Sequence, residues 1–258
     1  MSTLDKTAPK PCIASALKLI SAIFFSLLIC SCEFFSPAVS KSPIIVLTFD
    51  DQHESIYQIA LPLMQEYGFP GTNFVNSGAL GSPGLLSWNQ LIEMQTLYHW
   101  ETGGHSLRHE DLPNLSFTEA EYAIREDFNL LTQHNLNPKS FALPRGDCPL
   151  ELYPILSELY HNLRGSSDFV MYKPINRMAL GYLSVQGEWT AQPVIDRINR
   201  GLSQEESLII IGFHRFTEAD FAFDYTCTRA VFKDILEFIA SSKLSVMTLN
   251  QAIDFIAD

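Results

Sequence analysis

The chain has 258 residues, of which 47% are hydrophobic and 18% charged, and its 17 Lys and Arg against 29 Asp and Glu give a formal charge of −12. This composition is that of a globular protein, and a core of this size needs no disulfide bonds. The acidic balance argues against nucleic acid and anionic membrane surfaces as partners, and favours a neutral or cationic substrate. Length alone allows one or two domains, since α/β barrels commonly run to about 200–250 residues.

The first 32 residues predict an export signal. Three lysines precede an apolar run at residues 19–29, which is too short to span a hydrocarbon core of about 30 Å. The run ends in Ile-Cys-Ser-Cys at residues 29–32, which resembles a bacterial lipobox with Cys32 as lipid acceptor, although Cys30 at its middle position is unusual. We expect a lipoprotein-type signal over residues 1–32 and a tether over residues 33–43, with this segment as the chain's only membrane contact. Ordinary cleavage near Ala38, which would give a soluble secreted protein, is the alternative.

Removal of the signal changes the charge and the cysteine content. Residues 1–32 carry three Lys and one Asp, a net charge of +2, so the remaining 226 residues carry −14. Cys148 and Cys227 stay in the folded part, and an oxidising compartment allows them to pair if their Cα atoms lie within about 7 Å. The sequence leaves both the bridged and the free form open.

Apolar runs alternate with helical patterns over residues 43–258. Short apolar and β-branched runs predict strands at residues 43–49, 72–76, 100–105, 140–143, 163–171 and 207–213. Helical spacing, with a capping-box sequence at Ser116 and Glu119, predicts helices at residues 57–67, 86–97, 116–133, 150–160, 192–202 and 228–241. Residues 246–249 and 251–256 complete the alternation. This order predicts parallel strands with right-handed crossovers, in either a barrel or an open doubly wound sheet.

Polar side chains follow three of the predicted strands. Asp50 and Asp51 end the first, His105 and His109 follow the third, and His214 follows the apolar run at 207–213. Two histidines four residues apart share one face if the segment forms a helical turn, and with a carboxylate they can bind one metal ion. Each feature also has a simpler reading, because Asp-Asp is common in turns and a histidine after an apolar strand is often buried and neutral.

Four motifs in order make the pattern more specific: Thr-Phe-Asp-Asp at 48–51, His-Ser-x-x-His at 105–109, Phe-Ala-Leu-Pro-Arg-Gly at 141–146 and Gly-Phe-His at 212–214. In order and spacing they resemble the polysaccharide deacetylase family, also called the NodB-homology domain or carbohydrate esterase family four. The resemblance implies an α/β fold, a distorted (β/α) barrel of about seven parallel strands, in a single catalytic domain over residues 44–258. It also implies metal-dependent removal of N-acetyl groups from the amino sugars of a glycan.

The resemblance implies a role for each matching residue. Asp51, His105 and His109 would bind a divalent metal, most often Zn²⁺, and Asp50 would be the general base. His214 would be the general acid that protonates the leaving amine, and the backbone N–H of Arg145 would help to hold the oxyanion. These residue types fit amide hydrolysis, which needs an activated water, a stabilised oxyanion and a protonated leaving group.

The third motif departs from the usual family pattern. Many members carry an arginine before its proline, paired with the base aspartate, whereas this chain has Leu143 before Pro144. The resulting Phe-x-x-Pro-x-Gly pattern resembles that of some exopolysaccharide deacetylases. Arg177 is our candidate for the missing cation, with a solvated arginine as the alternative.

Three aromatic residues are candidates for stacking on a sugar ring: Trp88, Trp100 and Tyr225. Core packing is the commoner fate of a tryptophan.

The sequence therefore predicts an exported hydrolase, either a membrane-anchored lipoprotein or a periplasmic or extracellular protein. It would remove N-acetyl groups from peptidoglycan, an exopolysaccharide or a chitin-like glycan. Two alternatives stay open: a non-catalytic envelope lipoprotein that binds glycan, and an amidohydrolase that acts on a small non-glycan amide.

Overall fold

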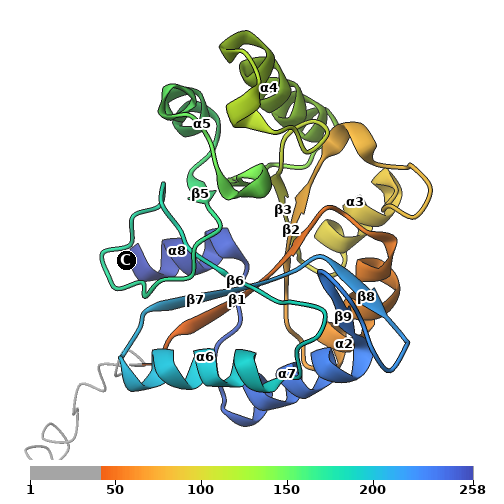
Figure 1. Ribbon diagram of the computed structural model, residues 1–258, viewed down its shortest axis with the longest axis vertical. Helices are drawn as coiled ribbons and strands as arrows, with labels where there is room; N and C mark the ends of the chain where they lie inside the picture. Colours follow the sequence, from red (N-terminus) through yellow and green to blue (C-terminus); the bar gives the residue numbers. More distant parts are fainter. Residues whose placement is uncertain (1–41, 258) are drawn as a thin grey trace, which may run out of the picture. The chain divides into compact units, whose positions relative to one another are not determined.

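The computed structural model describes residues 42–257 (Figure 1). The predicted signal with Cys32 and most of the predicted tether lie outside the described residues, so the proposed lipidation stays a prediction. Among the helices of residues 42–257, none has the length and apolarity needed to cross a lipid bilayer.

Seven parallel strands form the central sheet, in the order β5-β4-β3-β2-β1-β7-β6 (Figure 1). They are β1 (Ile44–Asp50), β2 (Thr72–Val75), β3 (Glu101–Gly104), β4 (Ser140–Ala142), β5 (Asn162–Arg164), β6 (Leu183–Ser184) and β7 (Leu208–Phe213). A separate parallel pair, β8 (Arg215–Thr217) and β9 (Thr226–Thr228), follows β7.

The stretch of chain that leads into β6 joins the two edges of the sheet. Leu163 donates to the carbonyl of Arg177 at 2.7 Å, Gly165 donates to that of Leu180 at 2.9 Å, and Leu180 donates back to Leu163 at 2.9 Å. The same stretch then continues into β6, which pairs with β7. Both edge strands are thereby connected, which closes the sheet into the distorted (β/α) barrel that the sequence predicts, in a single domain.

Seven α-helices cover the sheet in the described part of the chain: α2 (Leu61–Glu66), α3 (Trp88–Thr96), α4 (Phe117–Gln133), α5 (Tyr153–Leu159), α6 (Gln192–Ser203), α7 (Arg229–Ser241) and α8 (Leu249–Ala257). Helix α4 begins with the predicted capping box, in which Ser116 and Glu119 satisfy each other's backbone N–H groups. Helix α8 closes the N-terminal end of the barrel, because Leu249 N–H donates to Thr72 Oγ1 at 2.9 Å and Asn250 N–H donates to Glu101 at 2.8 Å.

Strand β1 is the centre of the core. Every one of its residues is buried, as expected for a parallel strand covered on both faces. Ile45, Leu47 and Phe49 pack with the helices outside the barrel, whereas Val46 packs inside it with Phe74. This double burial fixes the strand's register, so the position of Asp50 at its end is set by the core.

The structure corrects three details of the predicted elements. The helix expected at 57–67 begins with a π-helical turn, Ile56–Ala60. The strand expected at 163–171 ends at Arg164, since Gly165 and Ser166 leave the sheet to line a cavity. Strands β6, β8 and β9 were not predicted, because segments of two or three residues are too short to show a periodicity.

Cys148 and Cys227 are both buried and free, so the bridged form left open by the sequence is not the one that the structure contains. Burial raises the pKa of each thiol to about 12. At neutral pH both are therefore protonated and weak nucleophiles.

We predict that iodoacetamide at pH 8 leaves Cys148 and Cys227 unmodified in the native protein, because the reactive thiolate forms only near pH 12. In guanidinium chloride without reductant, both should be labelled, as peptide mass spectrometry would show. Labelling of either residue only after reduction would reveal a disulfide and contradict the structure.

Candidate active site

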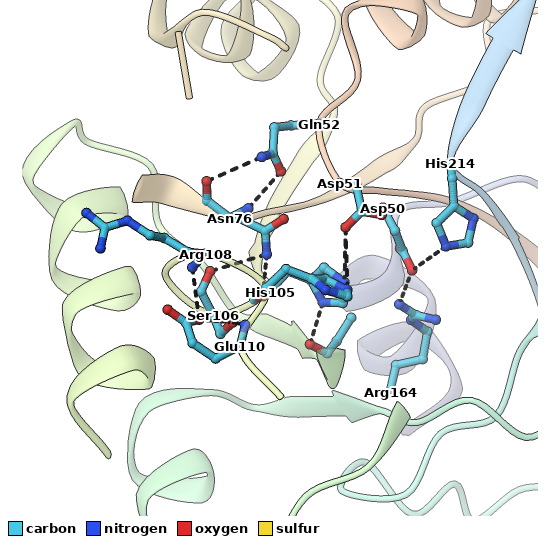
Figure 2. A network of polar contacts seen from close by, with 12 residues as sticks. Asp50, Asp51, Gln52, Asn76, His105, Ser106, Arg108, Glu110, Arg164 and His214 are labelled. Atoms are coloured by element: carbon cyan, nitrogen blue, oxygen red, sulfur yellow. Dashed lines mark hydrogen bonds and ion pairs between the residues drawn. The ribbon is translucent and has the colours of Figure 1, made fainter. Parts of the chain in front are cut away.

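The candidate residues lie together at the C-terminal ends of the parallel strands. Asp50 is the last residue of β1, His105 directly follows β3, and His214 directly follows β7. Figure 2 shows these side chains converging from different strands. The fold explains this convergence, because the carboxyl ends of parallel strands meet at one end of a barrel.

Asp51, His105 and His109 form a cluster of possible metal ligands, whose ligand atoms all lie within 4.8 Å of one another. Nε2 of His105 lies 3.6 Å from Asp51 Oδ1 (Figure 2). Nε2 of His109 lies 3.7 Å from the same oxygen. The cluster offers two imidazole nitrogens and one carboxylate, a set that suits zinc and related transition metals.

Two further observations indicate that these residues fit a metal ion. The Asp51 Oδ1 atom is buried and has no hydrogen-bond partner, so a cation is the kind of group that would satisfy it. Nδ1 of His105 lies 2.7 Å from the carbonyl oxygen of Ala142. A proton on Nδ1 would donate to this carbonyl and leave the Nε2 lone pair directed at the cluster, as in many metal sites.

The two histidines do not share a helical turn, which corrects the prediction from their spacing. The segment from 105 to 109 is an irregular loop, and Ser106 and His109 adopt left-handed backbone conformations with φ of 64° and 60°. Side-chain hydrogen bonds hold this loop: Asn76 Nδ2 donates to the carbonyl of His105 at 2.5 Å, and Ser106 Oγ donates to Glu110 at 2.6 Å (Figure 2). These bonds offset the cost of the left-handed conformations.

Asp127 of helix α4 positions the backbone of His105 and was missed at the sequence level. Its fully buried carboxylate accepts the N–H of His105 at 3.1 Å and the N–H of Ser77 at 3.0 Å. Burial raises the pKa of this carboxyl to about 7, against the effect of these hydrogen bonds. The one indication in the sequence is that Asp127 is a charged residue on the apolar face of a predicted helix. This pattern does not show which backbone groups the carboxylate binds.

Asp50 is buried beside Arg164, with side-chain exposures of 3% and 1%, and their charged atoms are 2.6 Å apart. His214 approaches the same oxygen, with Nε2 3.8 Å from Asp50 Oδ2. Burial favours the protonated form of Asp50, but the opposing effects, of which the Arg164 guanidinium is the largest, outweigh it and lower the pKa of the carboxyl. Asp50 is therefore ionised at neutral pH, and its Oδ1 atom has no hydrogen-bond partner.

The cation beside Asp50 comes from β5, and the prediction of Arg177 was wrong. Arg177 lies 2.7 Å from Asp254 of helix α8. Arg164 neighbours Ala142 in the sheet register, one strand away from the third motif, and its guanidinium lies over the ring of Tyr182 at 3.8 Å. The missing arginine of that motif is thus replaced from the adjacent strand.

A cavity of about 410 Å³ opens above these residues. The residues that line it include Asp50, Asp51, His105, His109, Arg145 and His214. Arg145 has a left-handed backbone with φ of 58°, and its side chain pairs with Asp111 at 3.1 Å. The structure thus brings every predicted site residue except Arg177 to one cavity.

The three aromatic candidates for sugar stacking have different surroundings. Trp100 is buried in the core against Phe49, and Trp88 stacks on His134 at a centroid distance of 3.8 Å. Tyr225 lines the cavity and lies 4.8 Å from the ring of His214. Of the three, Tyr225 alone faces the site.

The chain is similar to known proteins both in sequence and in fold. Residues 38–162 match the family model described as polysaccharide deacetylase. A poly-β-1,6-N-acetyl-D-glucosamine N-deacetylase of Staphylococcus aureus is 28% identical over 129 residues, covering 43% of this chain and 43% of the relative. The chain therefore matches less than half the length of this curated relative.

Two solved structures share the fold over most of both chains. The carbohydrate esterase domain of a multidomain xylanase from the hindgut metagenome of Trinervitermes trinervoides has a TM-score of 0.55 and 17% identity, covering 83% of this chain and 91% of that one. A family 4 carbohydrate esterase from Streptomyces lividans in complex with acetate has a TM-score of 0.51 and 16% identity, covering 80% and 93%.

We predict that Arg164→Met lowers the free energy of unfolding by about 3–5 kcal/mol, because it leaves the Asp50 carboxylate buried without a cation. Adding Asp50→Asn should restore part of this loss, since no buried charge then remains. Arg177→Ala is the matched control, and loss of its half-exposed ion pair should cost about 1 kcal/mol or less. Urea denaturation measures the free energy of unfolding of the wild type and the three variants. An equal loss of stability in Arg164→Met and Arg177→Ala would contradict the assignment of Arg164 as the cation beside Asp50.

Proposed function

Residues 38–162 match the polysaccharide deacetylase family, and from this premise we propose that the chain is a metal-dependent hydrolase that removes N-acetyl groups from the amino sugars of a glycan. The observation that carries the proposal is the position of Asp50 and His214 beside the Asp51–His105–His109 cluster in one cavity. A binding protein has no need of a base and an acid next to its metal site. This juxtaposition favours an enzyme over a glycan-binding lipoprotein.

Asp51, His105 and His109 would hold the metal in this proposal. When bound, a divalent ion such as Zn²⁺ would polarise the acetyl carbonyl and lower the pKa of a coordinated water to about 7. The neutral imidazole of His105 suits this task, because burial lowers its pKa despite the nearby carboxylates of Asp50 and Asp51.

Asp50 would act as the general base. Its Oδ2 atom is held by Arg164, so the unpartnered Oδ1 atom is the one free to accept a proton from water. Arg164 keeps the carboxylate ionised. Its hydrogen bond to Oδ2 also holds this oxygen away from the Asp51–His105–His109 cluster. Two adjacent aspartates thereby have separate roles, because only one of them is paired with a buried cation.

His214 would protonate the amine as it leaves, since the amine departs readily only in its neutral form. The ring lines the cavity, with Tyr225 against it and Asp50 beside Nε2. The backbone N–H of Arg145 would donate to the oxyanion, in a turn whose left-handed conformation directs this residue to the cavity wall. One such donor is worth about 3–4 kcal/mol of transition-state stabilisation in well-studied hydrolases.

The name of the Staphylococcus aureus relative supports a β-1,6-linked N-acetylglucosamine polymer as the first glycan to test. Such a polymer is neutral and becomes cationic as acetate is removed, so it suits an acidic protein. An exported protein is required to meet an extracellular or envelope glycan, which supports the predicted signal over residues 1–32; the proposed catalytic domain occupies residues 44–258.

The decisive experiment measures zinc content and acetate release for the wild type and for Asp50→Asn, on N-acetylglucosamine oligomers, peptidoglycan and exopolysaccharide. We predict that Asp50→Asn keeps its metal, because the amide oxygen can still accept a hydrogen bond from Arg164, and loses turnover by about 10²–10⁴-fold, because the carboxylate that accepts the proton is removed. His105→Ala should lose both metal and activity, and the exposed Asp254→Asn should lose neither.

Two results would contradict the proposal. One is a metal-loaded wild type that releases no acetate from any of these glycans. The other is an Asp50→Asn variant that turns over at the wild-type rate.

A further inference from the structure

The loop between β8 and β9, residues 218–225, carries a cluster of exposed aromatic side chains. Phe221 and Phe223 are 67% and 62% exposed, and their rings lie 5.5 Å apart. Tyr225 follows at the end of the loop and is 48% exposed. Single exposed aromatic residues are ordinary on a protein surface, but a cluster indicates a binding surface.

The structure fixes this loop against the wall of the active-site cavity. The N–H of Gly187 donates to the backbone carbonyl of Asp224, and a Cβ at position 187 would collide with the backbone of Phe223. The neighbouring Gln186 lines the cavity. Tyr225, which also lines it, packs against His214, so the loop that carries Phe221 and Phe223 ends at the cavity wall.

The same loop is acidic and contains no cation. Of its three carboxylates, Glu218 lies 3.4 Å from Arg229. Asp220 and Asp224 form no ion pair with any side chain of residues 42–257. The loop therefore carries two exposed aromatic rings and two exposed carboxylates without an ion-pair partner among the described residues, in the segment that ends at Tyr225 in the cavity wall.

We propose that residues 218–225 bind a glucosamine unit of the glycan next to the sugar being hydrolysed, an inference that rests on the proposed function. The aromatic rings would stack on the C–H face of the pyranose, and Asp220 and Asp224 would pair with its ammonium group. Anionic lipid would be repelled by the same charges, which disfavours a membrane contact. The enzyme would then favour chains from which acetate has already been removed.

The test compares two double variants, Phe221→Ala with Phe223→Ala and Asp220→Asn with Asp224→Asn. Tyr122→Ala and Asp234→Asn, on exposed positions of α4 and α7, are the matched controls. The substrates are a fully acetylated β-1,6-linked pentamer, the same pentamer with two glucosamine units, and a small aryl acetate. Thermal unfolding and zinc content establish that each variant is folded.

The aromatic double variant should lower kcat/KM on both pentamers, relative to the aryl acetate, by about fivefold or more. The acidic double variant should lower kcat/KM about threefold on the partly deacetylated pentamer alone, and 0.5 M salt should remove this difference. Calorimetry can measure affinity without turnover if each double variant is made in the Asp50→Asn protein. Both double variants should then bind the glucosamine-containing pentamer more weakly than the Asp50→Asn protein alone.

Three results separate the possibilities. If the wild type cleaves the aryl acetate but releases no acetate from any glycan, the proposed function fails. If it deacetylates glycans and both double variants match the controls on every substrate, the loop inference alone is overturned. If the aromatic variant instead loses binding to phosphatidylethanolamine–phosphatidylglycerol vesicles with unchanged pentamer kinetics, the loop contacts membrane and the inference is overturned.

Discussion

The buried pair of Arg164 and Asp50 is the interaction on which the arrangement of the site depends. It links the ends of β5 and β1 across the inside of the barrel, with the guanidinium between the rings of Phe74 and Tyr182. Tyr182 belongs to the stretch that closes the sheet, so barrel closure and the ion pair support each other. A buried pair stabilises a fold little by itself, but removal of one partner is costly, which restricts the side chains to this geometry.

Around this pair, the loops after the strands contain strained backbone conformations that side-chain hydrogen bonds stabilise. Asp51 and Gln52 have φ of 66° and 40°, and Gln52 accepts the N–H of Asn76 at 2.8 Å. Asn76 in turn holds the carbonyl of His105, so one network connects the loops after β1, β2 and β3. Left-handed conformations in residues other than glycine cost energy and persist where the surroundings fix them, a feature common at active sites. The network orients the cluster without depending on any single loop.

Local patterns in the sequence were sufficient to predict most of the fold and the cluster. The apolar run of β1 and the capping box of α4 act through neighbouring residues, and strand ends share one edge in any parallel barrel. Arg164 could not be predicted as the cation beside Asp50, because the two residues lie 114 positions apart. The sequence does not show which arginine side chain points into the barrel. The loop at 105–109 was assigned a helical turn for a related reason: its conformation is set by Asn76 and Glu110 rather than by its own spacing.

We propose different tasks for the two adjacent aspartates: Asp51 would be a metal ligand, and Asp50 would be a base beside Arg164. Anomalous X-ray diffraction at the zinc edge, on crystals of the zinc-loaded protein, tests this most directly. We predict one peak at about 2.0–2.2 Å from an Asp51 oxygen and from Nε2 of His105 and His109, with Asp50 still bound to Arg164. A peak coordinated by Asp50, or no peak at this cluster, would contradict the account.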